Sequence, residues 1–132
     1  MDEQEIRNFL CERLQNATDA GDRIFNSRTV NLRRVELPCI SVYTPNEIAS
    51  DSGSILMSLE IYIFVAAGEE DDLGALSAGL KRQVKQLMKD SGADCGGGFA
   101  EVYQSKDTTF DMDGEKPTAI VRLNYQLETL DD

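Results

Sequence analysis

The sequence predicts one α+β domain over residues 1–132, with two helices packed on one face of a mostly antiparallel sheet. Three observations predict this class. Two separate segments carry apolar residues at helical spacing, and long segments between and after them carry apolar residues at every second position. The last two alternating segments are joined by a short turn, which predicts an antiparallel hairpin. A chain of 132 residues is typical of one domain and can bury a substantial core.

The first helix is expected over residues 3–17, where apolar residues recur three and four positions apart and so share one face. These residues are Ile6, Phe9, Leu10, Leu14 and Ala17. Acidic residues at its start favour a helix N-terminus, and residues 18–21 end it. A short strand is then expected at 23–25, and an edge segment within 30–35.

The next strands are marked by prolines and by alternation. Residues 39–43 form a β-rich segment between Pro38 and Pro45, so a strand that ends at Pro45 is expected. A polar loop over 46–53 should follow. Residues 54–65 then read as a long central strand with one buried face and one mixed face. The buried face comprises Ile55, Met57, Leu59, Ile61, Ile63 and Val65.

The acidic run at 69–72 precedes a second helix that is expected to reach Lys89, with Gly92 as its cap. Its apolar positions are Leu73, Leu76, Leu80, Val84, Leu87 and Met88. The acids are interpreted as helix N-terminal charge, with a metal or partner site as the alternative. Strands over 99–110 and 118–130, joined by a turn at 111–117, should form the hairpin. The buried face of the last strand comprises Ala119, Val121, Leu123, Tyr125 and Leu127.

Charge is distributed unevenly along the chain, which carries 24 acidic and 13 basic residues and a net charge of -11. Residues 35–80 contain no Lys or Arg, and their acids are Glu36, Glu47, Asp51, Glu60, Glu69, Glu70, Asp71 and Asp72. Such polarity favours docking to other proteins. It disfavours nucleic acid and anionic membrane surfaces, because phosphate contacts need clustered Lys and Arg. Two basic clusters exist, but both are small: Arg28, Arg33 and Arg34, and Lys81, Arg82, Lys85 and Lys89.

The sequence offers no constellation for catalysis, and neither a cofactor nor a metal is expected. It has no His and only three widely spaced cysteines, which excludes the usual zinc sites and Cys-His or Ser-His nucleophiles. Cys11 and Cys39 are expected to be reduced and buried, and Cys95 more exposed. The glycines at 96–98 follow a helix and enter a strand, which predicts a turn and not a phosphate loop. The acids at 111–115 leave weak divalent-cation binding open, although a solvated turn is favoured.

The order of these elements resembles that of the tail terminator proteins of long-tailed phages, the minor tail protein U family. The resemblance is carried by an initial helix and by an Arg-bearing segment that leads into Leu37-Pro38-Cys39-Ile40-Ser41-Val42-Tyr43. A polar loop and the strand over 54–65 follow, then the acidic-start helix over 69–89. The alternating strand that begins at Ala119 closes the pattern, which covers nearly the whole chain.

This resemblance implies a structural function without catalysis. Members of this family form a hexameric ring on the finished tail tube, stop its polymerisation and offer the surface that joins the head. The implied partners are other copies of the chain, the major tail tube protein and the head-tail joining protein. The implied locations are the host cytoplasm during assembly and the virion tail, which agrees with an acidic N-terminus unlike a signal peptide. The exposed loops at 44–53, 94–98 and 111–117 would carry the contacts.

A subunit contact is also expected within this ring. Arg28, Arg33 and Arg34 would face acids of the next copy, for which the candidates are Asp51, Glu69 and Asp71. A chain with an acidic and a smaller basic surface can join head to tail and close into a ring. The alternative for Arg33 and Arg34 is a solvated strand edge.

Three other functions compete with this interpretation. A head-completion or neck protein of a phage would have a similarly small α+β fold. An acidic inhibitor that imitates DNA would use the carboxylates of residues 35–80, although much of that segment is predicted core strand. A small enzyme or ligand-binding domain is the third, and no residue pattern supports it.

Overall fold

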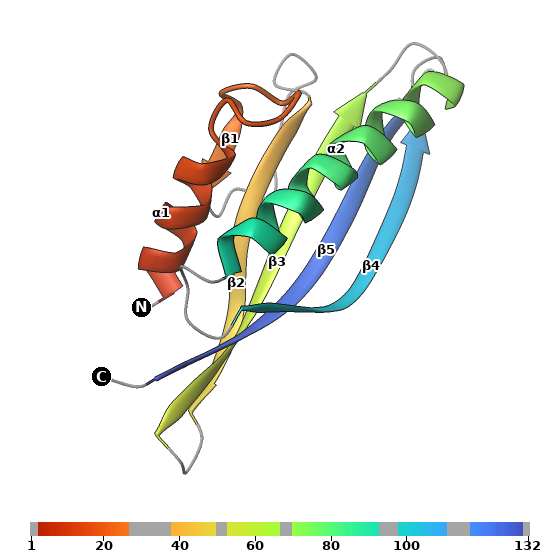
Figure 1. Ribbon diagram of the computed structural model, residues 1–132. Coiled ribbons are helices and arrows are strands. Elements are labelled where there is room, and N and C mark those ends of the chain that lie inside the picture. Colours follow the sequence, from red (N-terminus) through yellow and green to blue (C-terminus); the bar gives the residue numbers. More distant parts are fainter. Residues whose placement is uncertain are drawn as a thin grey trace.

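The computed structural model describes residues 3–26, 38–49, 53–66, 70–92, 98–110 and 117–130. The elements are α1 (Glu3–Leu14), β1 (Ile24–Asn26), β2 (Cys39–Ala49), β3 (Ser54–Ala66), α2 (Glu70–Ser91), β4 (Phe99–Phe110) and β5 (Pro117–Leu130). Both helices lie on the same face of a single sheet (Figure 1), with α1 packed on β1 and β2 and α2 packed on β3 and β5. The predicted α+β class is confirmed.

The sheet of the described residues has five strands in the order β1-β2-β3-β5-β4. The short β1 pairs in parallel with β2, and all other neighbours are antiparallel. The predicted hairpin of the last two strands is confirmed. Because β5 inserts between β3 and β4, the unit β3–α2–β4 joins two parallel strands that do not touch, which is a split β-α-β arrangement. The twelve-residue β4 therefore lies at one edge of the sheet, beside α2.

The core lies between the helices and the sheet, as the periodicities predict. Alternate residues of β3 and β5 face the helices and are buried, from Met57 to Val65 and from Ala119 to Leu127. The helices contribute Ile6, Leu10, Leu14, Leu73, Leu80, Val84 and Met88 to this core. Complete burial of one such aliphatic side chain contributes roughly 1.5–3 kcal/mol.

The predicted end of the strand at Pro45 is wrong, because β2 continues to Ala49. Its pairing with β3 shifts between Tyr43, opposite Glu60, and Asn46, opposite Ser58. Pro45 lies in this irregularity, where a residue without an N–H breaks no ladder bond. The segment 46–49, predicted as loop, is therefore strand, and the β2–β3 hairpin extends past the helices at the lower end of Figure 1.

The first helix is shorter than predicted, ending at Leu14 instead of residue 17. Asn16 has a φ of 57°, in the left-handed region that asparagine tolerates better than most residues. The backbone N–H of Asn16 donates to the carbonyl oxygen of Gly21 at 2.9 Å, so the chain reverses direction here. Ala17 is consequently exposed instead of extending the apolar face. The short strand predicted at 23–25 is found one residue later, at Ile24–Asn26.

The second helix confirms the predicted pattern with one exception. Leu73, Leu80, Val84 and Met88 are buried, but Leu76 keeps 41% of its surface exposed at the margin of the apolar stripe. Gly92 follows the helix, and a Cβ on it would lie 3.2 Å from the Cα of Gly98. Glycine at this position therefore lets the end of α2 approach the start of β4 closely.

Candidate subunit interface

Most of the residues predicted to form the subunit contact lie outside the described residues. This applies to Arg28, Arg33, Arg34, Asp51 and Glu69. Asp71 lies in the first turn of α2, but the structure describes only its backbone. The pairing of the arginines with these acids therefore stays a prediction. Of the predicted contact loops, 44–53 is wrong over its first residues, which belong to β2, and most of the other two lies outside the described residues.

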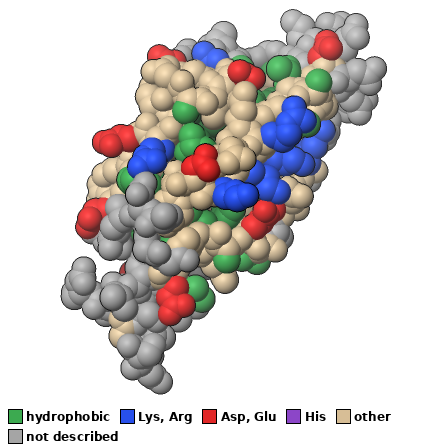
Figure 2. Space-filling view, viewed as in Figure 1, with side chains coloured by type: hydrophobic (Ala, Val, Ile, Leu, Met, Phe, Trp, Pro, Cys, Tyr) green, Lys and Arg blue, Asp and Glu red, His purple; other side chains and the backbone are tan. Residues whose placement is uncertain are grey.

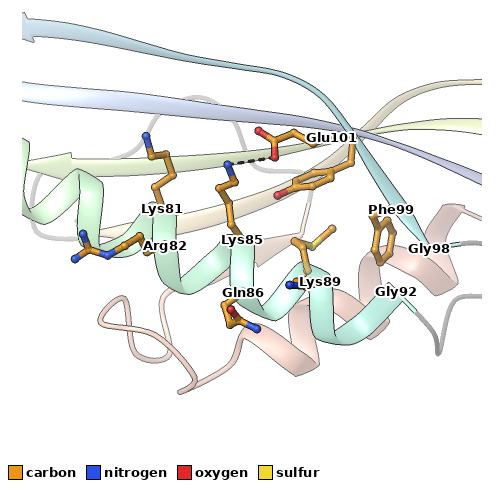
Figure 3. A pocket seen from close by; sticks show the side chains of 11 residues that line it. Lys81, Arg82, Lys85, Gln86, Lys89, Gly92, Gly98, Phe99 and Glu101 are labelled. Atoms are coloured by element: carbon orange, nitrogen blue, oxygen red, sulfur yellow. Dashed lines mark ion pairs between the residues drawn. The ribbon is translucent and has the colours of Figure 1, made fainter.

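The structure brings the second basic cluster together beside a groove. Lys81, Lys85 and Lys89 are spaced four residues apart and therefore form one row along α2. The groove, of about 810 Å³, runs between α2 and the start of β4. Lys81 and Lys85 rise from the helix toward β4 (Figure 3), and basic side chains gather over this part of the helix face (Figure 2). Sequence reasoning identified these cations but not the groove.

The cations of this row contribute little to the stability of the fold. Lys85 Nζ lies 3.2 Å from Glu101 Oε2, with 36% of each side chain exposed, and such an exposed pair is worth about 0–1 kcal/mol. Lys81, Arg82 and Lys89 form no ion pair within the described part of the chain. Like charges four residues apart on a helix cost roughly 0.2–0.5 kcal/mol per pair. The lysine row is therefore a small cost to the isolated chain.

The floor of the groove is apolar and aromatic. Met88 and Tyr125 are buried, and the half-buried Phe99 packs edge-on against Tyr125 with ring centroids 6.3 Å apart. Burial, assisted by the charge of Glu101, raises the pKa of the Tyr125 phenol to about 12. This phenol stays neutral at physiological pH, so the lysine row lies beside an uncharged groove floor.

A second cluster lies on the sheet face opposite the helices. Tyr62 and Phe64 are stacked with centroids 6.2 Å apart, and the Arg122 guanidinium lies 5.8 Å from the Tyr62 ring. The Tyr62 hydroxyl donates to a carboxylate oxygen of Glu60. The sequence indicated only that this face of β3 is mixed. The cluster adds a polar, aromatic surface but no group arranged for catalysis.

The cysteines and acids add no metal site among the described residues. No group of three or more His, Cys, Asp or Glu side chains lies close enough there to hold an ion. Cys39 is buried and Cys11 half-buried, and both are reduced, whereas Cys95 lies outside the described residues. The acids at 111–115 also lie outside them. None of the described helices is both long and apolar enough to cross a membrane.

Comparison with solved structures finds a chain of similar fold. A chain from "Virion of native gene transfer agent (GTA) particle" matches 94% of this chain and 95% of its own length, with a TM-score of 0.54 and 12% identity. A likeness at this identity shows that the two chains share a fold over nearly their whole lengths. No protein-family model matches the sequence, and no curated protein matches it either.

Proposed function

We propose that this protein is a structural component of a phage-like particle and, within it, the tail terminator. The observation that carries the proposal is the fold likeness to a chain of a gene transfer agent virion over nearly the full length of both chains. It agrees with the resemblance of the element order to the terminator family. In this function the chain forms a hexameric ring that caps the tail tube and offers the surface for head joining.

Such a function requires shape and surface charge but no reaction. One surface of each copy binds a different surface of the next, and these contacts close into a ring when the rotation between copies permits. A ring that matches the symmetry of the tube covers the surface to which further tail subunits would add. The partners are therefore other copies of the chain, the major tail tube protein and the head-tail joining protein. Assembly takes place in the host cytoplasm, and the product is part of the virion tail.

Deletion of the gene from its particle-encoding cluster tests this function. We expect tubes that grow past their normal length and heads that stay unattached, as seen by electron microscopy of the lysate. Expression of the wild-type chain from a plasmid should restore both tail length and joining. As a matched control, a plasmid carrying the Leu80→Asp variant, which places a charge in the core, should restore neither.

The same experiment separates the terminator from its nearest alternative. Tails of normal length beside unjoined heads would contradict the terminator and favour a head-completion or neck protein. Particles that form normally without the chain would exclude both functions. The DNA-mimic alternative is disfavoured by the exposed lysine row and groove, because a duplex mimic needs carboxylates along its exposed face.

A further inference from the structure

The two halves of α2 present different surfaces to solvent. Near the start of the helix, Asp72 and Leu76 are exposed and lie one turn apart. Near the end of the helix, the lysine row borders the groove with its apolar floor. The surface at the start of α2 thus combines a negative charge with an exposed apolar side chain. The surface at its end combines positive charges with a groove that has an apolar floor.

These two surfaces complement each other but cannot meet within one chain. Lys81 follows Asp72 by nine positions, which corresponds to about 13 Å along a rigid helix. Every copy therefore carries both an acidic, apolar patch and a groove complementary to it, and both lie along α2. A contact between different patches of identical copies repeats from one copy to the next, as ring assembly requires.

We propose that the groove beside the lysine row binds the first turns of α2 from a second copy of this chain. Asp72 would lie against Lys81 and Lys89, and Leu76 would enter the floor formed by Met88, Phe99 and Tyr125. This contact supplies a reason for the exposure of Leu76 and for the presence of Lys81 and Lys89, which form no ion pair among the described residues. The inference rests on the proposed ring function and names its subunit contact.

Two charge-reversed variants test the contact. The first carries Lys81→Glu with Lys89→Glu, which leaves the Lys85–Glu101 pair intact. The second carries Asp72→Lys. Glu12→Lys, on the exposed side of α1, makes the same charge change as the second variant and serves as its matched control. Thermal unfolding establishes that each variant is folded, and sedimentation at high protein concentration measures self-association.

We expect each variant alone to self-associate at least about tenfold more weakly than wild type, because acids then face acids or bases face bases. An equal mixture of the two should regain wild-type association, since every contact then pairs opposite charges. The Glu12→Lys control should behave as wild type does. A mixture no better than either variant alone would overturn the inference, as would unchanged association of the separate variants.

Zero-length carbodiimide cross-linking of isotopically labelled and unlabelled wild-type chains provides a second readout. Mass spectrometry should identify inter-chain bonds from Lys81 or Lys89 to Asp72. Absence of these bonds at high protein concentration overturns the inference, even if the chain stays monomeric. If wild type limits tail length but the mixed variants do not regain self-association, the proposed contact is wrong and the terminator function stands. If the mixed variants regain self-association but wild type does not limit tail length, the contact stands and the terminator function is wrong.

Discussion

The two helices pack on one face of the sheet, but the cations on their polar sides make different interactions. On α1, Arg7 Nε donates to Asn26 Oδ1 at 2.8 Å, and another guanidinium nitrogen donates to the Thr44 hydroxyl, so the helix is tied to β1 and β2. On α2, Arg82 and Lys89 form no ion pair among the described residues. The same amphipathic pattern thus yields one helix with an arginine that is bonded to the sheet and one with cations that form no ion pair among the described residues.

The difference follows from what surrounds each helix. The twelve residues of α1 lie beside β1 and β2, where the polar side chains of Asn26 and Thr44 are within reach. The 22 residues of α2 cross β3 and β5, whose described helix-facing residues are apolar. Among the described residues, the only ion pair of an α2 cation is that of Lys85 with Glu101 on β4. A charged side chain without an ion pair on a long surface helix therefore indicates a partner surface better than the net charge of the chain does.

The largest expected effects concern the buried faces, where the two helices should not differ. Leu10→Ala on α1 and Leu80→Ala on α2 remove side chains that are essentially buried. Each should lower the free energy of unfolding by about 2–5 kcal/mol, through lost transfer energy and the cavity that remains. Urea unfolding measures both losses. A loss under about 1 kcal/mol in either helix would show that this helix does not pack as described.

Substitutions on the polar sides of the two helices should have different effects on the free energy of unfolding. Arg7→Ala removes two charge-assisted hydrogen bonds, to the exposed Asn26 and the buried Thr44, and should cost about 1–3 kcal/mol. Arg82→Ala, a matched arginine on the exposed side of α2, should change the unfolding free energy by less than about 0.5 kcal/mol. Equal losses in the same urea titration would remove the contrast between the helices.

The smallest effect concerns Cys11 on α1, whose sulfur lies 4.0 Å from the carbonyl oxygen of Phe25. Burial, partly opposed by the charge of Arg7, raises the pKa of this thiol from 9.0 to about 11. At pH 8 the folded protein should therefore alkylate at Cys11 about a hundredfold more slowly than the urea-unfolded chain. Peptide mapping after timed iodoacetamide treatment measures the two rates.

The same shift has a consequence for stability at alkaline pH. The unfolded thiol ionises near pH 9 and the folded thiol near pH 11, so its contribution is complete below pH 9 and is lost as the pH rises to 11. Wild type should lose more stability over this interval than the Cys11→Ala variant. Parallel curves for the two proteins would show that Cys11 is no harder to ionise in the folded state.

Much of the fold could be predicted because its signals are local. The strand Phe99–Phe110 begins and ends at the predicted residues, and the buried alternation from Ala119 to Leu127 follows from period-two spacing alone. The errors lie where a local signal was overridden. Pro45 predicts a strand end, but a shift in pairing accommodates it, and Leu76 fits the apolar period yet lies at its margin.

The candidate site was less predictable. Sequence spacing identifies Lys81, Lys85 and Lys89 as one row of a helix, and the acidic run as a separate surface. It does not indicate that Phe99 and Tyr125, from two other elements, complete a groove beside that row. One signal was available: lysines at four-residue spacing repel one another on a helix, which is unfavourable unless something else contacts them.

The amino-acid sequence by itself determined the α+β class, the helix and strand segments, their buried faces and the location of the charges. These properties depend on spacing within one segment, and the 3.6- and two-residue periods specify that spacing wherever the segment lies. Only the tertiary structure decided that β5 lies between β3 and β4 and that the lysine row borders an aromatic floor. Both depend on contacts between distant segments, which form through the packing of the whole core and have no local period to reveal them.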